Sequence, residues 1–579
     1  MRFFASGRPR PPPRSMSHHC RFSHRPALPP PLPLHLWLAL LCTAALVLGL
    51  GIWEPTALTG KDEFFLGLRT PMEMMERQEW LVPFLDGAPR IRKPPLLYWL
   101  ARASYETFGI SLFSARLVTV LCATALVAAT VAIGRRLLLD NQAALGAGVL
   151  LLTCLGMASE SRRLMLDIPV AAFSAWAFWA FLVWQERLKL RWLLLAALFL
   201  GAGFLVKGPI VALVCGGGML GLMAARRFSW NELLSRWPAV LTALLLLAAV
   251  ALPWFLLVRE LHPEAAALVY ADEMEARQLA SFSLDMLPGL LQIALPWSFV
   301  ALALIWQGRR AIWHEAGPER LLLVWLLATC LPFLLVRTFD RYLVGSLVPL
   351  ALFLAWQLRN SAHLPPWTAR LGMGIAVLFG ALLAALAWRF QLGGWYWWLP
   401  AALYFVWAWG GRRERLHWLA APLLYWIALL WGLFPALGVN AVPPQVLQMG
   451  QSGRAIAMYD GPQPALLPIL SGRTLAHWPR VDAARAQALM AADGRVFVEH
   501  EDLPRLQRQL AEAGLMALPE GEYRVLASHG SGLRFARQGV RRSDWEQAWQ
   551  TRDPAPLMTT IHWLRLAPLS APLAGTGQP

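Results

Sequence analysis

Lysine and charge are both scarce in this chain of 579 residues. Only four of its 52 basic residues are lysines, namely Lys61, Lys93, Lys189 and Lys207, and all the others are arginines. Charged residues make up 15% of the chain, whereas a soluble domain carries roughly 25%, so a single water-soluble core is excluded. Because arginine is the usual cation here, each lysine is a candidate for a specific role, since the two side chains are not equivalent at an anion.

Cysteine is also sparse and provides no disulfide framework. Five of the six cysteines lie in apolar runs, and Cys20 lies in a basic N-terminal tail. Hydrophobic residues make up 57% of the chain, which excludes a disordered or fibrous protein.

Long apolar runs, in contrast, fill most of the first 437 positions. Runs of roughly 17–25 apolar residues separated by short polar loops are typical of membrane-spanning helices. We therefore predict about thirteen such helices by this length rule. Their approximate bounds are 34–53, 115–133, 142–158, 168–185, 192–206, 209–224, 237–258, 287–306, 321–337, 342–357, 371–388, 395–410 and 418–437.

The loops between these runs differ in charge. Arginine is abundant in the N-terminal tail and returns in every second loop, which predicts that those loops and the N-terminus lie in the cytoplasm. This distribution accounts for most of the net charge of +17. Because the charge is not gathered on one element, the sequence argues against nucleic-acid binding. The arginine-bearing loops lie at 135–136, 187–191, 226–227, 309–310, 359–370 and 412–415.

Three regions follow from these patterns. Residues 1–33, rich in proline, arginine and histidine, are predicted to form a disordered basic cytoplasmic tail. Residues 34–437 form the transmembrane region, with a long outer loop at 54–114. Residues 438–579 have shorter runs and charges of both signs, which predicts a small α/β domain outside the cytoplasm. Its predicted elements are a helix at 481–492, a strand at 495–499, a helix from 501 to about 513, and strands at 523–527 and 532–536.

The outer loop at 54–114 is long enough to carry structure of its own, and such loops are usually functional. Asp62 and Glu63 come just after the first membrane run. The apolar spacing from 64 to 76 predicts an amphipathic helix lying in the membrane interface. A turn follows at 86–87, and the two prolines after Lys93 impose an extended entry into a second helix at 96–108.

Short motifs recur between residues 34 and 360. They are Asp-Glu at 62–63, Trp-(x)2-Pro-(x)3-Gly from Trp80, Lys-Pro-Pro-Leu-x-Tyr-Trp from Lys93, Phe-Gly at 108–109, Ala-Arg-Leu at 115–117, Met-Leu-Asp-Ile-Pro from Met165, Lys-Gly-Pro from Lys207 and Leu-Pro-Trp from Leu295. Together they resemble the polyprenyl-phosphate-dependent membrane glycosyltransferases, and in particular the lipid A aminoarabinose transferases, which are related to the protein O-mannosyltransferases. The resemblance implies an all-α integral membrane protein of the GT-C type, here with a C-terminal α/β periplasmic domain, in the bacterial inner membrane.

The resemblance also implies a reaction without a cofactor. A sugar would pass from a polyprenyl (undecaprenyl) phosphate carrier to lipid A or another glycan or lipid acceptor by inverting single displacement. The leaving phosphate of such a donor needs cations, and the acceptor needs a carboxylate that deprotonates or orients it. By the resemblance, Asp62 is the catalytic carboxylate, and Lys93 and Lys207 contact the carrier phosphate.

Further residues are candidates for the same site. Arg163 lies with another arginine on an outer loop, against the positive-inside trend, and Arg277 lies in the second long outer loop. Both are predicted to face the carrier phosphate, although a surface role is open for Arg277. Glu63, Asp167 and Tyr98 are predicted to bind the sugar or the acceptor, although Asp167 could instead cap the helix that begins beside it.

Each main role has a plainer alternative. The Asp62-Glu63 pair could be a solvated helix end or complement a helix dipole. Lys93 could anchor the loop by reaching from apolar surface to water. Lys207 lies between two apolar runs with no acidic partner nearby in the sequence, which is costly unless the ammonium reaches water or an anion.

Three positions depart from the relatives' pattern. Relatives often have glutamate where Arg92 stands and Glu-Glu-His where Asp272-Glu273-Met274 stands. If those positions hold a divalent metal in relatives, arginine and methionine have replaced its ligands, and neither suits such a cation, so we predict no bound metal. Leu66 stands where relatives usually have tyrosine, which predicts an altered sugar pocket.

Two other functions stay open. A transporter or flippase of lipid-linked sugars would fit the many helices and the buried charge, but not a structured outer loop, and the two halves of the chain show no inverted repeat. A non-catalytic relative that still binds polyprenyl phosphate would fit the three departures.

Overall fold

The computed structural model describes residues 28–55, 63–276, 282, 284–335, 339–360, 366–410, 422–460, 466–526, 536–537 and 539–570. Two of the predicted site residues, Asp62 and Arg277, lie outside these ranges, as do most of the strand predicted at 532–536 and most of the tail at 1–33.

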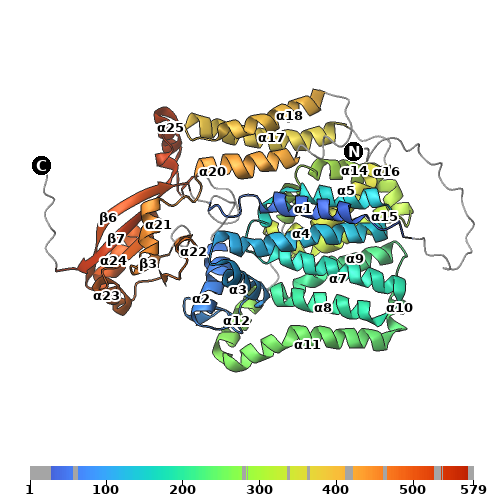
Figure 1. The fold of residues 1–579 in the computed structure, drawn as a ribbon, viewed down its shortest axis with the longest axis horizontal. Coiled ribbons are helices and arrows are strands. Elements are labelled where there is room, and N and C mark those ends of the chain that lie inside the picture. The colour runs from blue at the N-terminus through green and yellow to red at the C-terminus, as the bar shows by residue number, and fades with distance from the viewer. Residues whose placement is uncertain are drawn as a thin grey trace, which may run out of the picture.

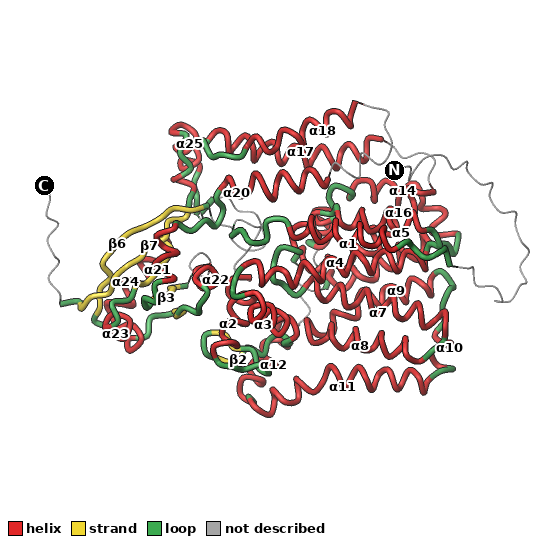
Figure 2. Tube along the Cα trace, in the orientation of Figure 1, coloured by secondary structure: helices red, strands yellow, loops and turns green. Residues whose placement is uncertain are grey.

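Helices dominate the first 437 positions and run side by side across the molecule (Figures 1 and 2). α4 (Leu112–Leu137) and α7 (Asp167–Arg187) form the buried centre. The others are α1 (Leu34–Gly49), α5 (Asn141–Leu152), α6 (Leu155–Glu160), α8 (Leu190–Lys207), α9 (Ala212–Ala224), α10 (Trp230–Leu234), α11 (Trp237–Leu261), α12 (Pro263–Ala276), α13 (Met286–Ile293), α14 (Ser298–His314), α15 (Pro318–Cys330), α16 (Leu347–Asn360), α17 (Pro366–Arg389), α18 (Trp398–Gly410) and α20 (Phe434–Leu437).

The number of membrane crossings is where the structure and the sequence prediction diverge. Within the described ranges, six helical stretches are long and apolar enough to cross a membrane, or seven if the bent pair of α13 and α14, which meet at 109°, counts as one span. Three shorter apolar helices accompany them. The protein is therefore a multi-pass membrane protein, but the predicted thirteen crossings are not confirmed, because several predicted spans are short helices or parts of longer ones. The 35-residue stretch Leu190–Ala224, for example, contains both α8 and α9, which a short 3-10 turn separates.

Small residues allow the central helices to approach one another closely. A Cβ atom added at Gly218 of α9 would lie 2.6 Å from the Phe178 ring of α7. One added at Gly221 would lie 2.5 Å from the backbone oxygen of Leu321 on α15. Close packing through small residues is the usual way in which membrane helices associate, and it fixes where the ends of these helices lie.

The first outer loop folds against the ends of these helices. It begins with a π-helix, Glu63–Leu68, which continues into α2 (Arg69–Glu76), so the helix predicted at 64–76 is confirmed. A hairpin follows, with β1 (Phe84–Leu85) paired to β2 (Ala88–Pro89). Positive φ angles at Asp86 and Gly87 are those that a tight hairpin turn requires. α3 (Leu96–Phe108) has the predicted bounds.

The C-terminal region is built around one five-stranded sheet in the order β4-β3-β5-β7-β6. β3 is parallel to β4 and β5, and β7 is antiparallel to β5 and β6. The strands are β3 (Ile456–Tyr459), β4 (Ala476–Trp478), β5 (Arg495–Glu499), β6 (Leu515–Val525) and β7 (Thr559–Pro568). The helices are α21 (Pro444–Gln451), α22 (Leu467–Ser471), α23 (Ala483–Ala491), α24 (Leu503–Glu512) and α25 (Arg542–Thr551).

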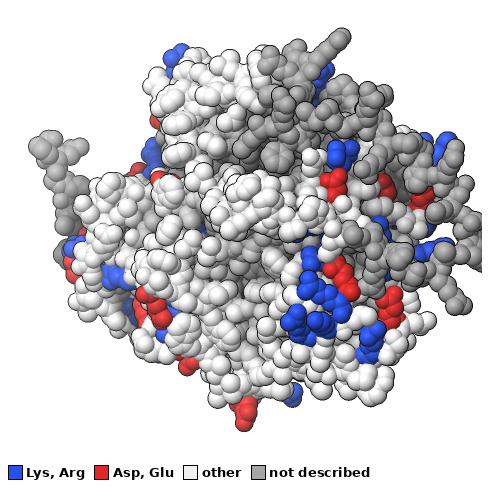
Figure 3. All heavy atoms as spheres, turned by 45° about the vertical axis from the view of Figure 1, so that its right-hand side comes forward, with Lys and Arg blue, Asp and Glu red and all other residues white. Residues whose placement is uncertain are grey.

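The two ends of the helical region differ in character. The sheet and the first-loop helices α2 and α3 lie at one end, whereas α4 and α7 finish at the other (Figure 1). The last turns of α4 and α7 carry Arg135, Arg136 and Arg187. Viewed toward that end, Lys and Arg side chains gather, with Asp and Glu side chains beside them, on a surface that is otherwise largely uncharged (Figure 3).

Candidate active site

A buried ion-pair cluster lies where three separate elements end beside the first-loop helices. Asp167 begins α7, Lys207 ends α8, and Arg341 lies in a 3-10 helix, Asp340–Ser346. The Lys207 ammonium donates a hydrogen bond to Asp167 Oδ1, and Arg341 Nε lies 3.7 Å from Asp167 Oδ2. Lys207 Nζ also lies 3.7 Å from the centroid of the Tyr342 ring. The cluster therefore joins one shared carboxylate, two cations and an aromatic face.

Lys207 does have an acidic partner, which its sequence neighbourhood did not indicate. Asp167 lies 40 positions earlier in the chain and meets Lys207 because α7 and α8 pack antiparallel along their length. From the sequence alone, Asp167 could either cap α7 or bind the sugar or the acceptor. Among the described residues its carboxylate contacts Lys207 and Arg341, and the residue that caps α7 has no side-chain hydrogen bond.

Further charges surround this pair. Arg163 Nη1 donates to Glu160 Oε1 at 3.2 Å, and Glu160 is close enough to Asp167 and Arg341 for their charges to act on it. Lys93, directly before α3, likewise acts on Lys207 through its charge. The described members of the cluster are thus Lys93, Arg163, Lys207 and Arg341 against Glu160 and Asp167. A cluster with such an excess of positive charge attracts anions.

Glu63 lies in a different, fully buried contact. Its carboxylate pairs with the Arg116 guanidinium, with Nε–Oε1 at 3.0 Å and Nη2–Oε2 at 3.4 Å, and accepts the Leu164 backbone N–H at 3.0 Å. Arg116 Nη1 also donates to the backbone oxygens of Ile52 and Glu54. This pair fastens the start of the first loop to α1, α4 and the segment before α7, which favours a positioning role for Glu63 over direct substrate binding.

Unlike the neighbouring Glu63 and Arg116 side chains, Arg162 is buried with part of its hydrogen-bonding capacity unused. Its side chain is 1% exposed, and its Nε and Nη1 atoms have no hydrogen-bond partner in the described part of the chain. The charge of Arg116 acts on it as well. A buried guanidinium without an anionic partner is costly.

The remaining predicted residues lie in or near the first loop. Tyr98 of α3 is 2% exposed, and its hydroxyl accepts a hydrogen bond from Arg90 Nε at 3.2 Å. The side chain of Arg92 is exposed. α12 ends at Ala276, immediately before Arg277. The π-helix that begins at Glu63 follows Asp62 directly, and such helices occur frequently at functional sites.

Sequence reasoning missed three charged residues of these clusters, Arg116, Glu160 and Arg341. Arg116 is the arginine of the Ala-Arg-Leu motif, placed one turn inside an apolar helix, so its position was itself a signal. Arg341 belongs to an Asp-Arg-Tyr run at the edge of an apolar stretch. Within the described ranges no group of three or more His, Cys, Asp and Glu side chains has an arrangement suited to a metal ion.

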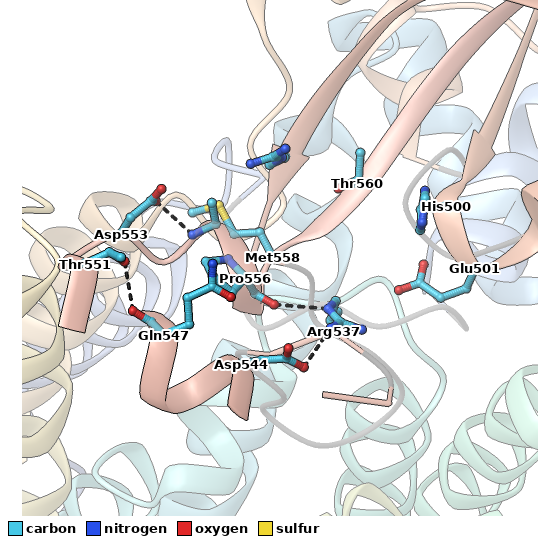
Figure 4. Close-up of a pocket in the computed structure, with 12 residues that line it drawn as sticks. His500, Glu501, Arg537, Asp544, Gln547, Thr551, Asp553, Pro556, Met558 and Thr560 are labelled. Carbon is cyan, nitrogen blue, oxygen red and sulfur yellow. Dashed lines mark hydrogen bonds and ion pairs between the residues drawn. The ribbon is translucent and has the colours of Figure 1, made fainter. Parts of the chain in front are cut away.

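A separate polar cavity of about 480 Å³ lies in the C-terminal domain, between α25 and the strands β6 and β7 (Figure 4). Arg537 crosses it and pairs with Asp544 at 2.7 Å, while Asp553 accepts the Ala555 backbone N–H. None of the predicted site residues that the structure describes lines this cavity.

Comparison with known proteins places the chain among glycosyltransferases. Residues 92–254 match the family model of dolichyl-phosphate-mannose-protein mannosyltransferases. The undecaprenyl phosphate-α-4-amino-4-deoxy-L-arabinose arabinosyl transferase of Pseudomonas aeruginosa is 31% identical over 400 residues, which covers 64% of this chain and 69% of that protein. The fold, the cationic cluster and these matches define a membrane glycosyltransferase that uses a lipid-phosphate sugar donor. The chain belongs to the undecaprenyl phosphate-α-4-amino-4-deoxy-L-arabinose arabinosyl transferase family.

Solved structures share this fold over almost the whole chain. The crystal structure of ArnT from Cupriavidus metallidurans in the apo state aligns with a TM-score of 0.65 at 17% identity and covers 92% of this chain and 98% of that one. The same protein bound to undecaprenyl phosphate aligns with a TM-score of 0.64 at 18% identity, covering 93% and 99%. The likeness therefore includes both the helical region and the C-terminal sheet.

Proposed function

We propose that the protein transfers a sugar from an undecaprenyl-phosphate-like carrier to lipid A, or to another glycan or lipid acceptor, at the periplasmic face of the inner membrane. The observation that carries this proposal is the cation-rich cluster around Lys207 and Asp167. It lies beside the first-loop helices and at the end of the molecule opposite the arginine-rich helix termini. The name of the Pseudomonas relative supports the donor class.

The proposed chemistry is a single displacement with inversion. The acceptor oxygen gives its proton to the Asp62 carboxylate and forms a bond to the anomeric carbon, while the bond from that carbon to the phosphate oxygen breaks. The electron pair of the broken bond leaves with the polyprenyl phosphate. Fixed cations that face this developing charge stabilise the transition state more than they stabilise the bound donor, whose phosphate carries less negative charge.

Lys207 is arranged to act on that leaving group. An ammonium has three N–H donors, and only one of them is directed at Asp167. Asp167 and the Tyr342 ring offset part of the cost of burying the charge. In this scheme Lys93, Arg163 and Arg277 are the other phosphate ligands, Arg341 joins them, and Tyr98 and Asp167 border the sugar or acceptor.

The proposed topology follows from the charge asymmetry. We assign the arginine-rich helix ends to the cytoplasm under the positive-inside rule, together with the N-terminus. The first loop and the α/β domain at 438–579 then lie in the periplasm. About thirteen crossings within 34–437 remain our proposal, with the shorter apolar helices completing the spans.

A transfer assay tests this proposal. Purified protein is supplied with radiolabelled undecaprenyl-phosphate aminoarabinose and lipid A, and Asp62→Asn is expected to abolish transfer while carrier binding persists. Unimpaired transfer by Asp62→Asn would remove that residue from its role. Carrier binding without transfer by the wild-type protein would favour the non-catalytic alternative, and movement of the labelled carrier across a vesicle membrane without transfer would favour a flippase.

The acceptor is identified by comparing lipid A and outer-membrane glycans of wild-type and deletion strains by mass spectrometry. The expected result is the loss of one sugar mass from lipid A. Loss from another glycan would change the acceptor and leave the reaction class intact.

A further inference from the structure

The C-terminal domain contacts the first outer loop through polar side chains. His477 of β4 lies with Nδ1 2.8 Å from Asp86 Oδ2, at the tip of the β1–β2 hairpin. Nearby, the Thr474 backbone N–H and hydroxyl both donate to Glu76 Oε1, the last residue of α2. Two points of contact therefore link the C-terminal domain to the loop that carries Asp62 and Lys93.

Asp86 transmits this contact into α2. Its other carboxylate oxygen, Oδ1, lies 2.6 Å from Arg69 Nη2, and Arg69 Nε donates to Glu73 Oε1 at 2.8 Å. Glu73 in turn accepts the backbone N–H groups of Asp86 and Gly87. The hairpin tip and α2 are thus bound into one unit, and the side chains of Arg69 and Glu73 are only 6% and 7% exposed.

Apolar packing continues the same contact toward α3. Leu466 and Ile469, at α22, share a buried core with Leu68 and Met72 of the first loop and with Tyr105 of α3. The Tyr105 hydroxyl donates to the Leu68 backbone oxygen at 3.2 Å. Both first-loop helices therefore rest on the C-terminal domain and on each other.

We propose that His477 is a positioning residue for the transfer reaction, acting through Asp86. This proposal rests on the proposed function. α2 continues the π-helix that starts at Glu63, next to Asp62, and α3 begins just after Lys93. We call the contacts of His477 with Asp86 and of Thr474 with Glu76 the clasp. Because the clasp holds the hairpin and α2 in place, it determines the positions of the catalytic carboxylate and of one phosphate-binding lysine. Small displacements of such groups reduce rates strongly.

Charge makes the clasp sensitive to protonation. Burial alone would raise the pKa of Asp86, but the hydrogen bond from His477 and the charges of Arg69, His477 and Arg485 outweigh it, so the pKa lies below its ordinary value of 3.8. Glu73 and Glu76 of α2 are the other charged groups at this contact. The ionised Asp86 carboxylate therefore stabilises this contact fully above pH 3.8, and this stabilisation is lost as the pH falls through the lowered pKa of Asp86.

Two independent readouts test the proposal on the full-length protein in detergent micelles. Hydrogen–deuterium exchange of α2 and the hairpin is expected to become about 5- to 30-fold faster in His477→Ala, the range for loss of one such contact. The kcat for transfer is expected to fall by a similar factor with little change in donor KM. His477→Asn, which keeps a hydrogen-bonding side chain, should rescue part of the rate.

A double-mutant cycle and a matched control complete the design. The double variant Asp86→Asn, His477→Ala should lower kcat and accelerate exchange in α2 no more than the more damaging of the two single variants, because the two residues share one contact. His562→Asn, on strand β7 of the same sheet but paired with His500 and Glu522, should leave exchange in α2 and kcat unchanged. Wild-type exchange and kcat in His477→Ala would overturn the proposal. Faster exchange in a protein whose wild type transfers no sugar would overturn the proposed function and leave the clasp standing.

Discussion

Two buried charge clusters in this protein are built on opposite principles. Glu63 and Arg116 pair one to one, and among the described residues the other polar groups that they contact are backbone donors and acceptors. The Asp167 carboxylate is instead shared between Lys207 and Arg341, with Lys93 and Arg163 close by. A satisfied pair rigidifies the structure, whereas a cation-rich cluster is prepared to receive an anion. The difference separates residues that hold the site from residues that act on the substrate.

Breaking the satisfied pair should have the largest effect on stability. Arg116→Met leaves Glu63 buried without its partner, so the free energy of unfolding should fall by about 3–5 kcal/mol. Thermal unfolding of the detergent-purified protein measures this change. The double variant Glu63→Met, Arg116→Met removes both charges and should recover much of the loss. An unchanged unfolding midpoint in Arg116→Met would show that the pair does not anchor the first loop.

Changing the cation-rich cluster should affect turnover more than stability. Lys207→Met should lower kcat by about 100- to 1000-fold, as for the loss of one donor to a developing oxyanion, while Arg341 still compensates Asp167. Lys207→Arg should also weaken turnover, because a planar fork does not replace a compact ammonium. Lys189→Met is the matched control, since Lys189 lies at the opposite end of α8. Normal kinetics in both Lys207 variants would make that lysine incidental.

Arg162 shares features with both clusters: it is buried like the Glu63–Arg116 pair, but two of its side-chain nitrogens have no hydrogen-bond partner among the described residues. Arg162→Met should raise the free energy of unfolding by about 1–2 kcal/mol, because it removes a buried charge that has no partner among the described residues. If the guanidinium meets an anionic group of the substrate, transfer should fall at the same time. Thermal unfolding and the transfer assay, run on the same preparation, measure both effects. Lower stability in Arg162→Met would mean that the arginine is already paired.

The smallest expected effect concerns metal ions. Arginine and methionine replace the ligands expected from relatives, so adding a chelator should leave the transfer rate unchanged. The assay is repeated with EDTA and with EDTA plus excess Mg²⁺ or Zn²⁺. Strong inhibition by EDTA that added metal reverses would contradict the prediction. It would also mean that an excess of fixed cations does not describe the Lys207–Asp167 cluster adequately.

Local patterns predicted local structure well. The prolines after Lys93 and the apolar spacing beyond them located α3, and the Asp86-Gly87 dipeptide located the hairpin turn. Strand β5 was also predicted with the correct bounds. In each case neighbouring residues determine the conformation through backbone sterics or side-chain periodicity, which a single sequence records directly.

Longer-range features could not be predicted in the same way. The Lys207–Asp167 pair and the contribution of Arg341 depend on which helix ends meet, and nothing local specifies that. Strand β7, which lies between β5 and β6, was missed although its burial alternates in part along Thr559–Pro568. The predicted thirteen crossings were not confirmed for a related reason: hydropathy marks apolar runs but does not show where a helix bends, as it does between α13 and α14.

The contact between His477 and Asp86 also has a consequence for the order in which the protein is made. The two residues are 391 positions apart, so at roughly 5–20 residues per second the ribosome adds His477 about twenty seconds to more than a minute after Asp86. Throughout that interval the first loop has already emerged but lacks the domain on which it rests. A truncated chain would insert its helices and still be without its clasp, which ties full activity to completed synthesis and translocation of the last domain.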